Sequence, residues 1–366
     1  MKFFGLKEHF ERATATAERF TGKHMTLPIL GNILMEVAEN SLKISATNLE
    51  HAVEIVVPGQ GSGEGKITVP AKVMASLIQS LKDDKVNLEE LKGTLHIRTD
   101  SQQVKVHGMA SDDFPLIPQV KQNTLFTLDG GALGMALESV LPAVSVSEFK
   151  PELNGILFKL GTGDLRLAST DTFRLAEKTL SRDRKGPESA APFIVPHRVC
   201  QEVSRILSRG NRPVTIALGD NQVEFTMEGV RVVSRTIEGN FPEYGAIVPK
   251  EFQTSTFVER GSLLEAVRAS SIFVSKLQDV TLTLSPTGIE VHSGNPEVGE
   301  YRMTVASATT GPGVAVRFNY KYLLDGLAAF HENEIFIGVN SDTSPAMLRG
   351  KSDSSLLYIL MPIRTA

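Results

Sequence analysis

The residues with the clearest chemical purpose are basic and lie on one predicted helix. In the segment HRVCQEVSRILSRGNR, arginines recur at intervals of seven, four and three residues, at Arg198, Arg205, Arg209 and Arg212. The apolar residues of this segment form a separate stripe, which predicts an amphipathic helix with a cationic face. Because no aromatic residues are interleaved, this face suits phosphate contacts better than base stacking. Such contacts hold a duplex without reading its sequence; a solvated helix face is the alternative interpretation.

Patterns that imitate catalytic or metal-binding motifs are incomplete. The glycine-rich GQGSGEGK at 59–66 has Gln60 and Ile67 where a phosphate-binding loop needs Gly and Ser or Thr, so we expect a flexible hairpin loop. The eight histidines form no HxxxH pair and there is no CxxC, so we expect no metal and no cofactor. Asp171 and Arg174 lack any accompanying nucleophile or base motif, and an aspartate in a strand turn more often bonds its own backbone.

The bulk composition narrows the class of protein. The 366 residues carry a net charge of −4, which argues weakly against a generic nucleic-acid binder but does not exclude a local basic surface. The single cysteine, Cys200, excludes an internal disulfide and fits a reducing compartment. The N-terminal segment is charged where a signal peptide needs an apolar core, and the apolar C-terminal run is too short for a membrane helix. We therefore expect a cytoplasmic protein with no membrane association.

The chain repeats itself at a period of about a third of its length. VPAKVM at 69–74 returns as VPHRVC at 195–200, and SATNLEHAVE at 45–54 returns as ASTDTFRLAE at 168–177. DDFP at 112–115 likewise returns as GNFP at 239–242. Such a period is too long for a solenoid, and each unit can hold its own core. We predict three domains of one design, at 1–122, 123–248 and 249–366.

Helical and strand periodicities alternate within each unit. Helical spacing predicts helices near 6–20, 73–81, 199–207 and 263–273, and period-two stretches predict hairpins within 94–108, 214–227 and 280–294. Two helices and several antiparallel strands per unit predict an α+β fold. The terminal LLYILMP is predicted to be a buried inner strand, a surface for a partner, or both. Three like units suggest an arc that closes by symmetric assembly.

These motifs together resemble one family. TLPILGNILMEV, LNGILF, ASTDTFRLA, GNFPEYGAIVPK and the terminal YILMPIR are similar, in order and spacing, to the bacterial sliding clamp, the beta subunit of DNA polymerase III. The resemblance implies a DNA clamp fold in a head-to-tail homodimeric ring with helices lining the hole. It implies a non-catalytic processivity factor that encircles duplex DNA. Its implied partners are the DNA polymerase III alpha subunit, the clamp loader, and other polymerases and repair proteins with short peptide motifs.

The resemblance also assigns sites residue by residue. A hydrophobic peptide pocket beside the terminal strand would comprise Leu153, Thr170, Thr172, Phe173, Arg174, Leu175, Pro242, Ile247, Ile359, Leu360, Met361, Pro362, Ile363 and Arg364. The DNA contacts would be His24 and Ser147 with neighbouring Lys23 and Lys150, together with Arg198, Arg205 and Arg209 of the basic helix. The subunit contact would join Val104 and Val106, on an edge strand, to Ile272 and Phe273.

Departures from the family bear on two of these sites. Thr172 and Phe173 stand where the family usually has Gly followed by His or Tyr, which alters the expected depth of the pocket. His24 stands where Arg is common, so that contact is expected to be weaker or pH-dependent. Two other functions remain open at this point: a clamp-fold binding module that forms no ring, and an enzyme that uses Asp171 and Arg174.

Overall fold

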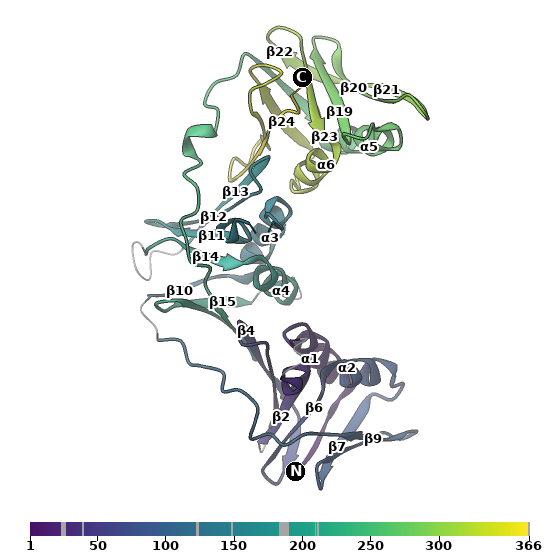
Figure 1. The fold of residues 1–366 in the computed structure, drawn as a ribbon, viewed down its shortest axis with the longest axis vertical. Helices are drawn as coiled ribbons and strands as arrows, with labels where there is room; N and C mark the ends of the chain where they lie inside the picture. The colour runs from purple at the N-terminus through teal and green to yellow at the C-terminus, as the bar shows by residue number, and fades with distance from the viewer. Residues whose placement is uncertain are drawn as a thin grey trace. The chain divides into compact units, whose positions relative to one another are not determined.

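The structure is a computed structural model that describes residues 1–22, 27–38, 40–121, 124–147, 149–182, 190–208, 210 and 212–364. Its ribbon is shown in Figure 1. The chain separates into two compact units, which are described one at a time. The first unit comprises Met1–Gly130 with Arg205–Thr236, and the second comprises the described residues of 131–204 and 237–366.

The first unit contains a five-stranded and an eight-stranded antiparallel sheet. Their strand orders are β5-β1-β7-β8-β9 and β10-β15-β16-β17-β4-β3-β2-β6. The strands are β1 (Lys2–Leu6), β2 (Asn32–Ala38), β3 (Ser41–Thr47), β4 (His51–Pro58), β5 (Gln60–Ser62), β6 (Gly65–Pro70), β7 (Lys85–Leu91), β8 (Thr94–Arg98), β9 (Gln103–His107), β10 (Thr124–Asp129), β15 (Pro213–Leu218), β16 (Gln222–Met227) and β17 (Val230–Arg235). Strands of the first and second repeats therefore share one sheet, joined where β17 pairs with β4.

Helices α1 (Lys7–Arg19) and α2 (Ala71–Ser80) of this unit contact each other and the strands beneath them, as Figure 1 shows. Phe10, Ala13 and Ala17 recur at helical spacing on α1, and each is at most 2% exposed. A stripe with this spacing buries one face of a helix and leaves its charged residues in solvent. A short 3-10 turn, η1 (Pro28–Gly31), precedes β2.

The second unit contains a nine-stranded and a four-stranded antiparallel sheet. Their orders are β14-β11-β12-β13-β26-β25-β24-β18-β22 and β21-β20-β19-β23. The strands are β11 (Gly155–Leu160), β12 (Asp164–Thr170), β13 (Arg174–Ser181), β14 (Phe193–Pro196), β18 (Thr254–Glu259), β19 (Asp279–Ser285), β20 (Gly288–Asn295), β21 (Gly299–Val305), β22 (Ser307–Thr310), β23 (Val314–Asn319), β24 (Glu334–Val339), β25 (Ala346–Gly350) and β26 (Leu356–Leu360). The second and third repeats share the larger sheet, joined where β13 pairs with β26.

The helices of the second and third repeats are α3 (Gly130–Val140), α4 (His197–Leu207), α5 (Arg260–Ser270) and α6 (Tyr320–Ala328), with the 3-10 turns η2 (Leu141–Ala143), η3 (Pro151–Leu153), η4 (Gly245–Ile247) and η5 (Ser271–Phe273). Side chains cap the starts of α5 and α6. Glu259 accepts hydrogen bonds from the first backbone N–H groups of α5, and Asn319 does the same for α6. Such caps satisfy donors that have no partner within the helix.

Helix α6 lies close against the terminal strand because it has a glycine at the contact. A Cβ added at Gly326 would stand 2.7 Å from two ring carbons of Tyr358, which is fully buried on β26. A larger residue at position 326 would force the helix and the strand apart. The close approach places Tyr322 and Asp325 of α6 beside the start of β13.

The predicted elements agree well with this architecture. The helices predicted near 6–20, 73–81, 199–207 and 263–273 are present, as are the three predicted hairpins. The terminal run forms β26, an inner strand between β13 and β25, as predicted. The α+β fold class is confirmed.

The expectation of a flexible loop at 59–66 is wrong in part. Gln60–Ser62 forms the edge strand β5 and pairs with β1. A Cβ at Gly61 would lie 2.1 Å from the carbonyl oxygen of Ala38, so the glycine permits this strand to pass close to its neighbour. Among the described residues, no helix is both long and apolar enough to cross a membrane.

Candidate functional site

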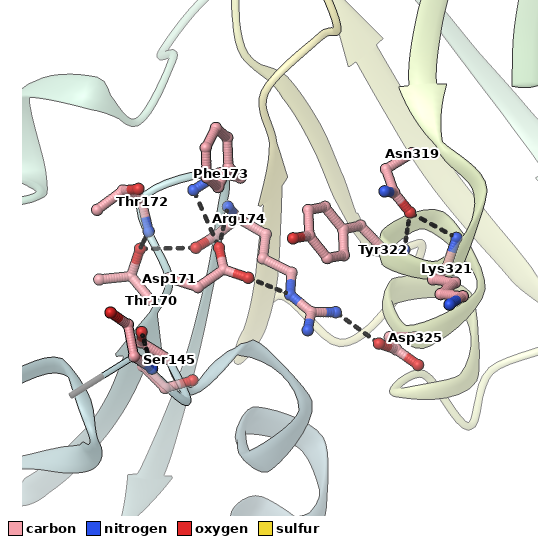
Figure 2. A network of polar contacts seen from close by, with 12 residues as sticks. Ser145, Thr170, Asp171, Thr172, Phe173, Arg174, Asn319, Lys321, Tyr322 and Asp325 are labelled. Carbon is pink, nitrogen blue, oxygen red and sulfur yellow. Dashed lines mark hydrogen bonds and ion pairs between the residues drawn. The ribbon is translucent and has the colours of Figure 1, made fainter. Parts of the chain in front are cut away.

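The turn between β12 and β13 is built from side-chain bonds to its own backbone (Figure 2). Asp171 Oδ1 accepts hydrogen bonds from the backbone N–H groups of Phe173 and Arg174, each at 2.9 Å. Thr170 Oγ1 accepts from the N–H of Thr172 and donates to the carbonyl of Arg174. Asp171 therefore has the structural role expected of an aspartate in a strand turn.

Thr172, at the tip of this turn, has a left-handed backbone with φ +77°. A β-branched residue adopts this conformation at a cost, whereas glycine does not. The glycine usual in the family at this position thus has a conformational reason, and the threonine here carries strain. Next to it, the Phe173 side chain is 58% exposed.

Arg174 extends from this turn toward α6 and is held by charged and aromatic groups on both sides (Figure 2). Its Nε lies 2.9 Å from Asp171 Oδ2, and one terminal nitrogen lies 2.5 Å from Asp325 Oδ2. The guanidinium carbon sits 4.2 Å from the centre of the Tyr322 ring, a cation–π distance. With its side chain only 11% exposed, Arg174 is fixed in direction.

The ionisation of these groups follows from their surroundings. Burial opposes the charged form of Arg174, but Tyr358, Asp325 and Asp171 outweigh it and raise the pKa of Arg174 above its ordinary value. Burial likewise raises the pKa of Tyr358 and, to a lesser extent, that of Tyr322. At neutral pH the site is therefore one permanent cation among two carboxylates and two neutral phenols. Both carboxylates pair with the Arg174 guanidinium, so the charges of the site largely balance one another.

The opposite face of the same two strands is apolar. In the antiparallel pairing of β13 with β26, Leu175 faces Ile359 and Arg174 faces Leu360. Leu175 and Ile359 form a cluster with Met347 of β25. Tyr244 and Val248, from the segment between β17 and β18, pack against this cluster. Because neighbouring residues of a strand point to opposite faces, Leu175 and Arg174 lie on opposite faces of the sheet, one apolar and one charged.

Tyr244 is attached to this apolar surface by a polar contact. Its hydroxyl donates a hydrogen bond to Glu177 Oε2. Burial and the neighbouring Glu177 carboxylate raise the pKa of Tyr244, which keeps the phenol neutral. The segment that carries Tyr244 also carries Pro242, which is exposed, and Ile247, which is 47% exposed.

The terminal residues continue this surface beyond β26. The N–H of Met361 donates to the carbonyl of Phe173 at 2.8 Å, and the N–H of Ile363 donates to the carbonyl of Arg317. Met361 and Ile363 are half-buried, Pro362 is buried and Arg364 is exposed. The structure thus brings the turn at 170–175 and the terminal segment 359–364 together, as expected from the resemblance.

Leu153 and Leu360 are nearly fully buried, at 2% and 1% exposure, as are Leu175 and Ile359 at 1% each. Leu360 pairs opposite Arg174, on the face of the sheet covered by α6, and Leu153 ends η3. Their side chains belong to the supporting core.

Sequence reasoning missed several residues of this site. Tyr322 and Asp325 hold Arg174, and Tyr244 and Met347 complete the apolar cluster. The paired residues Arg174 and Asp325 are 151 positions apart, so no local spacing signals their contact.

The expected DNA contacts are only partly within the described chain. Lys23, His24 and Arg209 lie outside the described residues. Ser147 and Lys150 are exposed in the segment after η2, and Arg198 and Arg205 are exposed on α4. Arg198 and Arg205 are two helical turns apart and so lie on one face of α4, opposite the buried Val199 and Val203.

The expected subunit contacts lie beside free sheet edges. Val104 and Val106 are on β9, the edge of the five-stranded sheet, as predicted. Ile272, which is 70% exposed, and Phe273 form η5, where the Phe273 ring stacks on Tyr301 of β21. β21 is itself an edge strand. Sequence reasoning missed two exposed apolar residues here, Met303 on β21 and Val298 directly before it.

Within the described part of the chain, no three His, Cys, Asp or Glu side chains are grouped to hold a metal ion. Cys200 is fully buried on α4, and burial raises the pKa of its thiol well above the ordinary value. An inert buried thiol of this kind serves packing.

Known proteins are similar to this chain over its full length. The N-terminal, central and C-terminal domain models of the DNA polymerase III beta subunit match residues 1–118, 127–243 and 246–364. Beta sliding clamps of Staphylococcus epidermidis and Staphylococcus aureus are each 26% identical over 379 residues, covering all of both chains.

Solved structures of the same kind superpose closely. The DNA polymerase III beta subunit of Thermotoga maritima matches with a TM-score of 0.92 and 27% identity, and covers all of both chains. The sliding clamp of Bacillus subtilis matches with a TM-score of 0.91 at 24% identity, also over both full chains. Since the three domain models match in order along nearly the whole chain, the protein belongs to the DNA polymerase III beta subunit family, the beta sliding clamps.

Proposed function

We propose that this chain is the sliding clamp of a bacterial DNA polymerase III, a non-catalytic processivity factor that works in the cytoplasm. The observation that carries the proposal is that all three clamp domain models match this chain in order, and that its fold is that of a solved beta subunit. We place the domain boundaries at 1–122, 123–248 and 249–366. Asp171 bonds the backbone of its own turn and pairs with Arg174, which gives both residues a structural role.

The ring would form by pairing of two free edges from different subunits. β9 and β21 are edge strands, and unpaired edges of this kind are sites for strand addition. Ile272, Val298 and Met303 provide exposed apolar surface near the second edge. A contact between two different surfaces of the same chain is heterologous, and two such contacts close a head-to-tail homodimeric ring.

Duplex DNA would be held by the exposed basic residues without sequence preference. Arg198, Arg205 and Lys150 offer cations for phosphates, joined by Ser147 and by Lys23, His24 and Arg209. Phosphate contacts permit sliding because they are equivalent from one base pair to the next. Topological linkage then replaces affinity, which is compatible with the net charge of −4.

Partner proteins would dock a short peptide on the surface formed by the turn at 170–175 and the terminal segment. Leu175 and Ile359 supply an apolar floor, while Ile247, Phe173 and Met361 supply its accessible margin. Met361 adapts to side chains of different shape because it is unbranched. The margin is completed by Thr170, Thr172, Pro242, Pro362, Ile363 and Arg364. The buried side chains of Leu153 and Leu360 support it from the core. The occupants would be the polymerase alpha subunit, the clamp loader, and other polymerases and repair proteins.

Primer extension by the cognate polymerase on singly primed circular DNA tests this function. With the cognate clamp loader, the wild-type chain is expected to convert short products into full-length ones. The double variant Phe173→Asp, Met361→Asp is expected to lose this stimulation, whereas Lys82→Glu, an exposed change elsewhere, keeps it. Full stimulation by the double variant would remove the pocket from the proposal, and no stimulation by the wild type would remove the clamp function.

A further inference from the structure

The first unit contains a groove at the junction of the first and second repeats. Its volume is about 230 Å³. It lies among the turn after β3, the segment 115–118 and the end of β17, and its principal lining residues are Thr47, Leu49, His51, Pro115, Leu116 and Arg235. We call it the Leu116 groove, because Leu116 lines it and is 97% exposed.

The turn at this groove has the same construction as the turn at 170–174. Asn48 Oδ1 accepts hydrogen bonds from the N–H groups of Glu50 and His51, at 3.0 and 2.9 Å. Thr47 Oγ1 donates to the carbonyl of His51 and accepts from the N–H of Leu49. Leu49 has φ +76°, against +77° at Thr172. Asn48 and Leu49 thus correspond to Asp171 and Thr172.

The neighbouring strands also pair in the same register. His51 faces Ser234 and Ala52 faces Val233 in the pairing of β4 with β17. One residue further along the chain, the N–H of Arg235 donates a hydrogen bond to the carbonyl of Glu50 at 2.9 Å. In the other turn, the N–H of Met361 donates a hydrogen bond to the carbonyl of Phe173 at 2.8 Å. Arg235 therefore occupies the position of Met361.

The segment that closes the groove repeats as well. Pro115 ends the DDFP motif, as Pro242 ends the corresponding GNFP. Leu116 and Pro118 follow it and line the groove. The first unit therefore holds a second copy of the surface that the proposed function assigns to partner peptides.

The two copies differ in size and charge. Ala52 and Val233 replace Leu175 and Ile359, so the floor is made of smaller side chains. Arg235 places a cation where the other copy has the thioether of Met361. The Arg235 side chain is exposed, and Glu50 is the one carboxylate among the described lining residues. An aliphatic side chain fits the enlarged recess, and a carboxylate fits Arg235.

We propose that the Leu116 groove is a second docking site, for a short extended peptide of a partner protein that carries an aliphatic residue next to an acidic one. The proposal rests on the proposed function, because the peptide mode is inferred from the equivalent surface of the second unit. The aliphatic side chain enters the recess between Leu49 and Leu116 over Ala52. The carboxylate of the peptide pairs with Arg235.

The experiment selects ten-residue peptides from a random display library on the full chain carrying Phe173→Asp and Met361→Asp, which disable the other surface. Enriched peptides are synthesised with a fluorescent label and their affinities for the wild-type chain and its variants are measured by anisotropy. Leu116→Asp and Arg235→Glu alter exposed side chains, so the fold is expected to persist, and thermal unfolding checks that it does. Lys82→Glu is the matched control for charge reversal.

We expect enriched peptides to contain an aliphatic–acidic pair and to bind at least tenfold more weakly to Leu116→Asp and to Arg235→Glu. Arg235→Lys should restore part of the affinity, Glu50→Gln should leave it unchanged or raise it, and Lys82→Glu should leave it unchanged. Enrichment of no peptide, or of peptides indifferent to both groove variants, overturns the proposal. Neither result alters stimulation of the polymerase through the turn at 170–175, so failure here is distinct from failure of the proposed function.

Discussion

The guanidinium of Arg174 on β13 lies 2.5 Å from Asp325 Oδ2 on α6, and so links a strand of the second repeat to a helix of the third. The same guanidinium also bonds Asp171 in its own turn. This pair of contacts sets the direction of the turn that carries Phe173, and with it the shape of the surface beside the terminal strand.

Arg174→Ala is expected to destabilise the chain by about 2 kcal/mol, because it leaves the largely buried carboxylate of Asp171 without its cation. Asp325→Ala should cost about 1 kcal/mol, since the Asp325 side chain is 43% exposed and solvent screens its charge. Urea unfolding measures both values. The matched control is Lys351→Ala, whose ion pair with Glu334 is about half exposed and should cost no more than ~0.5 kcal/mol. An Arg174→Ala variant as stable as this control would show that the network does not stabilise the fold.

Thr172→Gly is expected to stabilise the chain by about 0.5–1 kcal/mol, because glycine adopts the left-handed conformation without strain. The gain is partly offset by the larger entropy that glycine loses on folding. Thr179→Gly, in the ordinary strand conformation of β13, is the control and should destabilise. The denaturant midpoints of the two variants are compared with that of the wild type. A loss of stability in Thr172→Gly would contradict the strain assigned to this position.

Ile272→Asp is expected to convert a dimer into monomers without unfolding the subunit, since the Ile272 side chain is 70% exposed within one chain. A charge placed in the apolar centre of a subunit contact is desolvated without a partner. Sedimentation velocity over a range of concentrations measures the assembly state. Leu125→Asp, which alters another partly exposed apolar residue, should remain dimeric. An unchanged dimer in the Ile272 variant would place the contact elsewhere, and a monomeric wild type would favour a clamp-fold module without a ring.

Asp353 gives the stability a defined dependence on pH. Despite the opposing effect of burial, hydrogen bonds from Ser355 and the nearby Lys178 lower the pKa of Asp353 from 3.8 to about 2. The folded chain therefore binds this proton less readily than the unfolded chain does. The stabilisation is fully present above about pH 4 and is lost as the pH falls toward 2. Because the carboxylate is about half exposed, the effect of Asp353→Asn at pH 7 should stay below about 1 kcal/mol.

The comparison of wild type and Asp353→Asn by urea unfolding at several pH values tests this sign. Their stabilities should differ at pH 7 and converge as the pH approaches 2. A difference that grows as the pH falls would contradict the lowered pKa. Ser355 and Lys178 remain in the variant, so the test isolates the carboxylate charge.

Local patterns were sufficient to predict the elements but not the way in which they join. Helical spacing on α1 and α4 and alternation in β15, β16, β19 and β20 are properties of short segments, and each was predicted correctly. Asp171 was also predictable, because an aspartate in a strand turn bonds the next N–H groups. The inner position of β26 followed from its apolar composition.

Contacts between distant segments could not be predicted in this way. The pairing of Arg174 with Asp325 spans 151 positions, and nothing in the local sequence of either residue specifies the other. The sharing of one sheet by two repeats, through β17 with β4 and β13 with β26, likewise depends on tertiary pairing. The face of each strand that meets a helix then decides which terminal residues are accessible, so Leu360 is buried beneath α6 while Met361 is not.

The most direct test of the central claim is retention on closed and opened DNA. The labelled chain is loaded by its cognate clamp loader onto nicked circular duplex DNA, and the complex is isolated by gel filtration at about 0.2 M salt, where phosphate contacts alone are weak. The account predicts that the protein stays with the circle and is released when a restriction enzyme linearises it. Equal retention before and after linearisation, or no retention on the circle, would contradict a sliding ring.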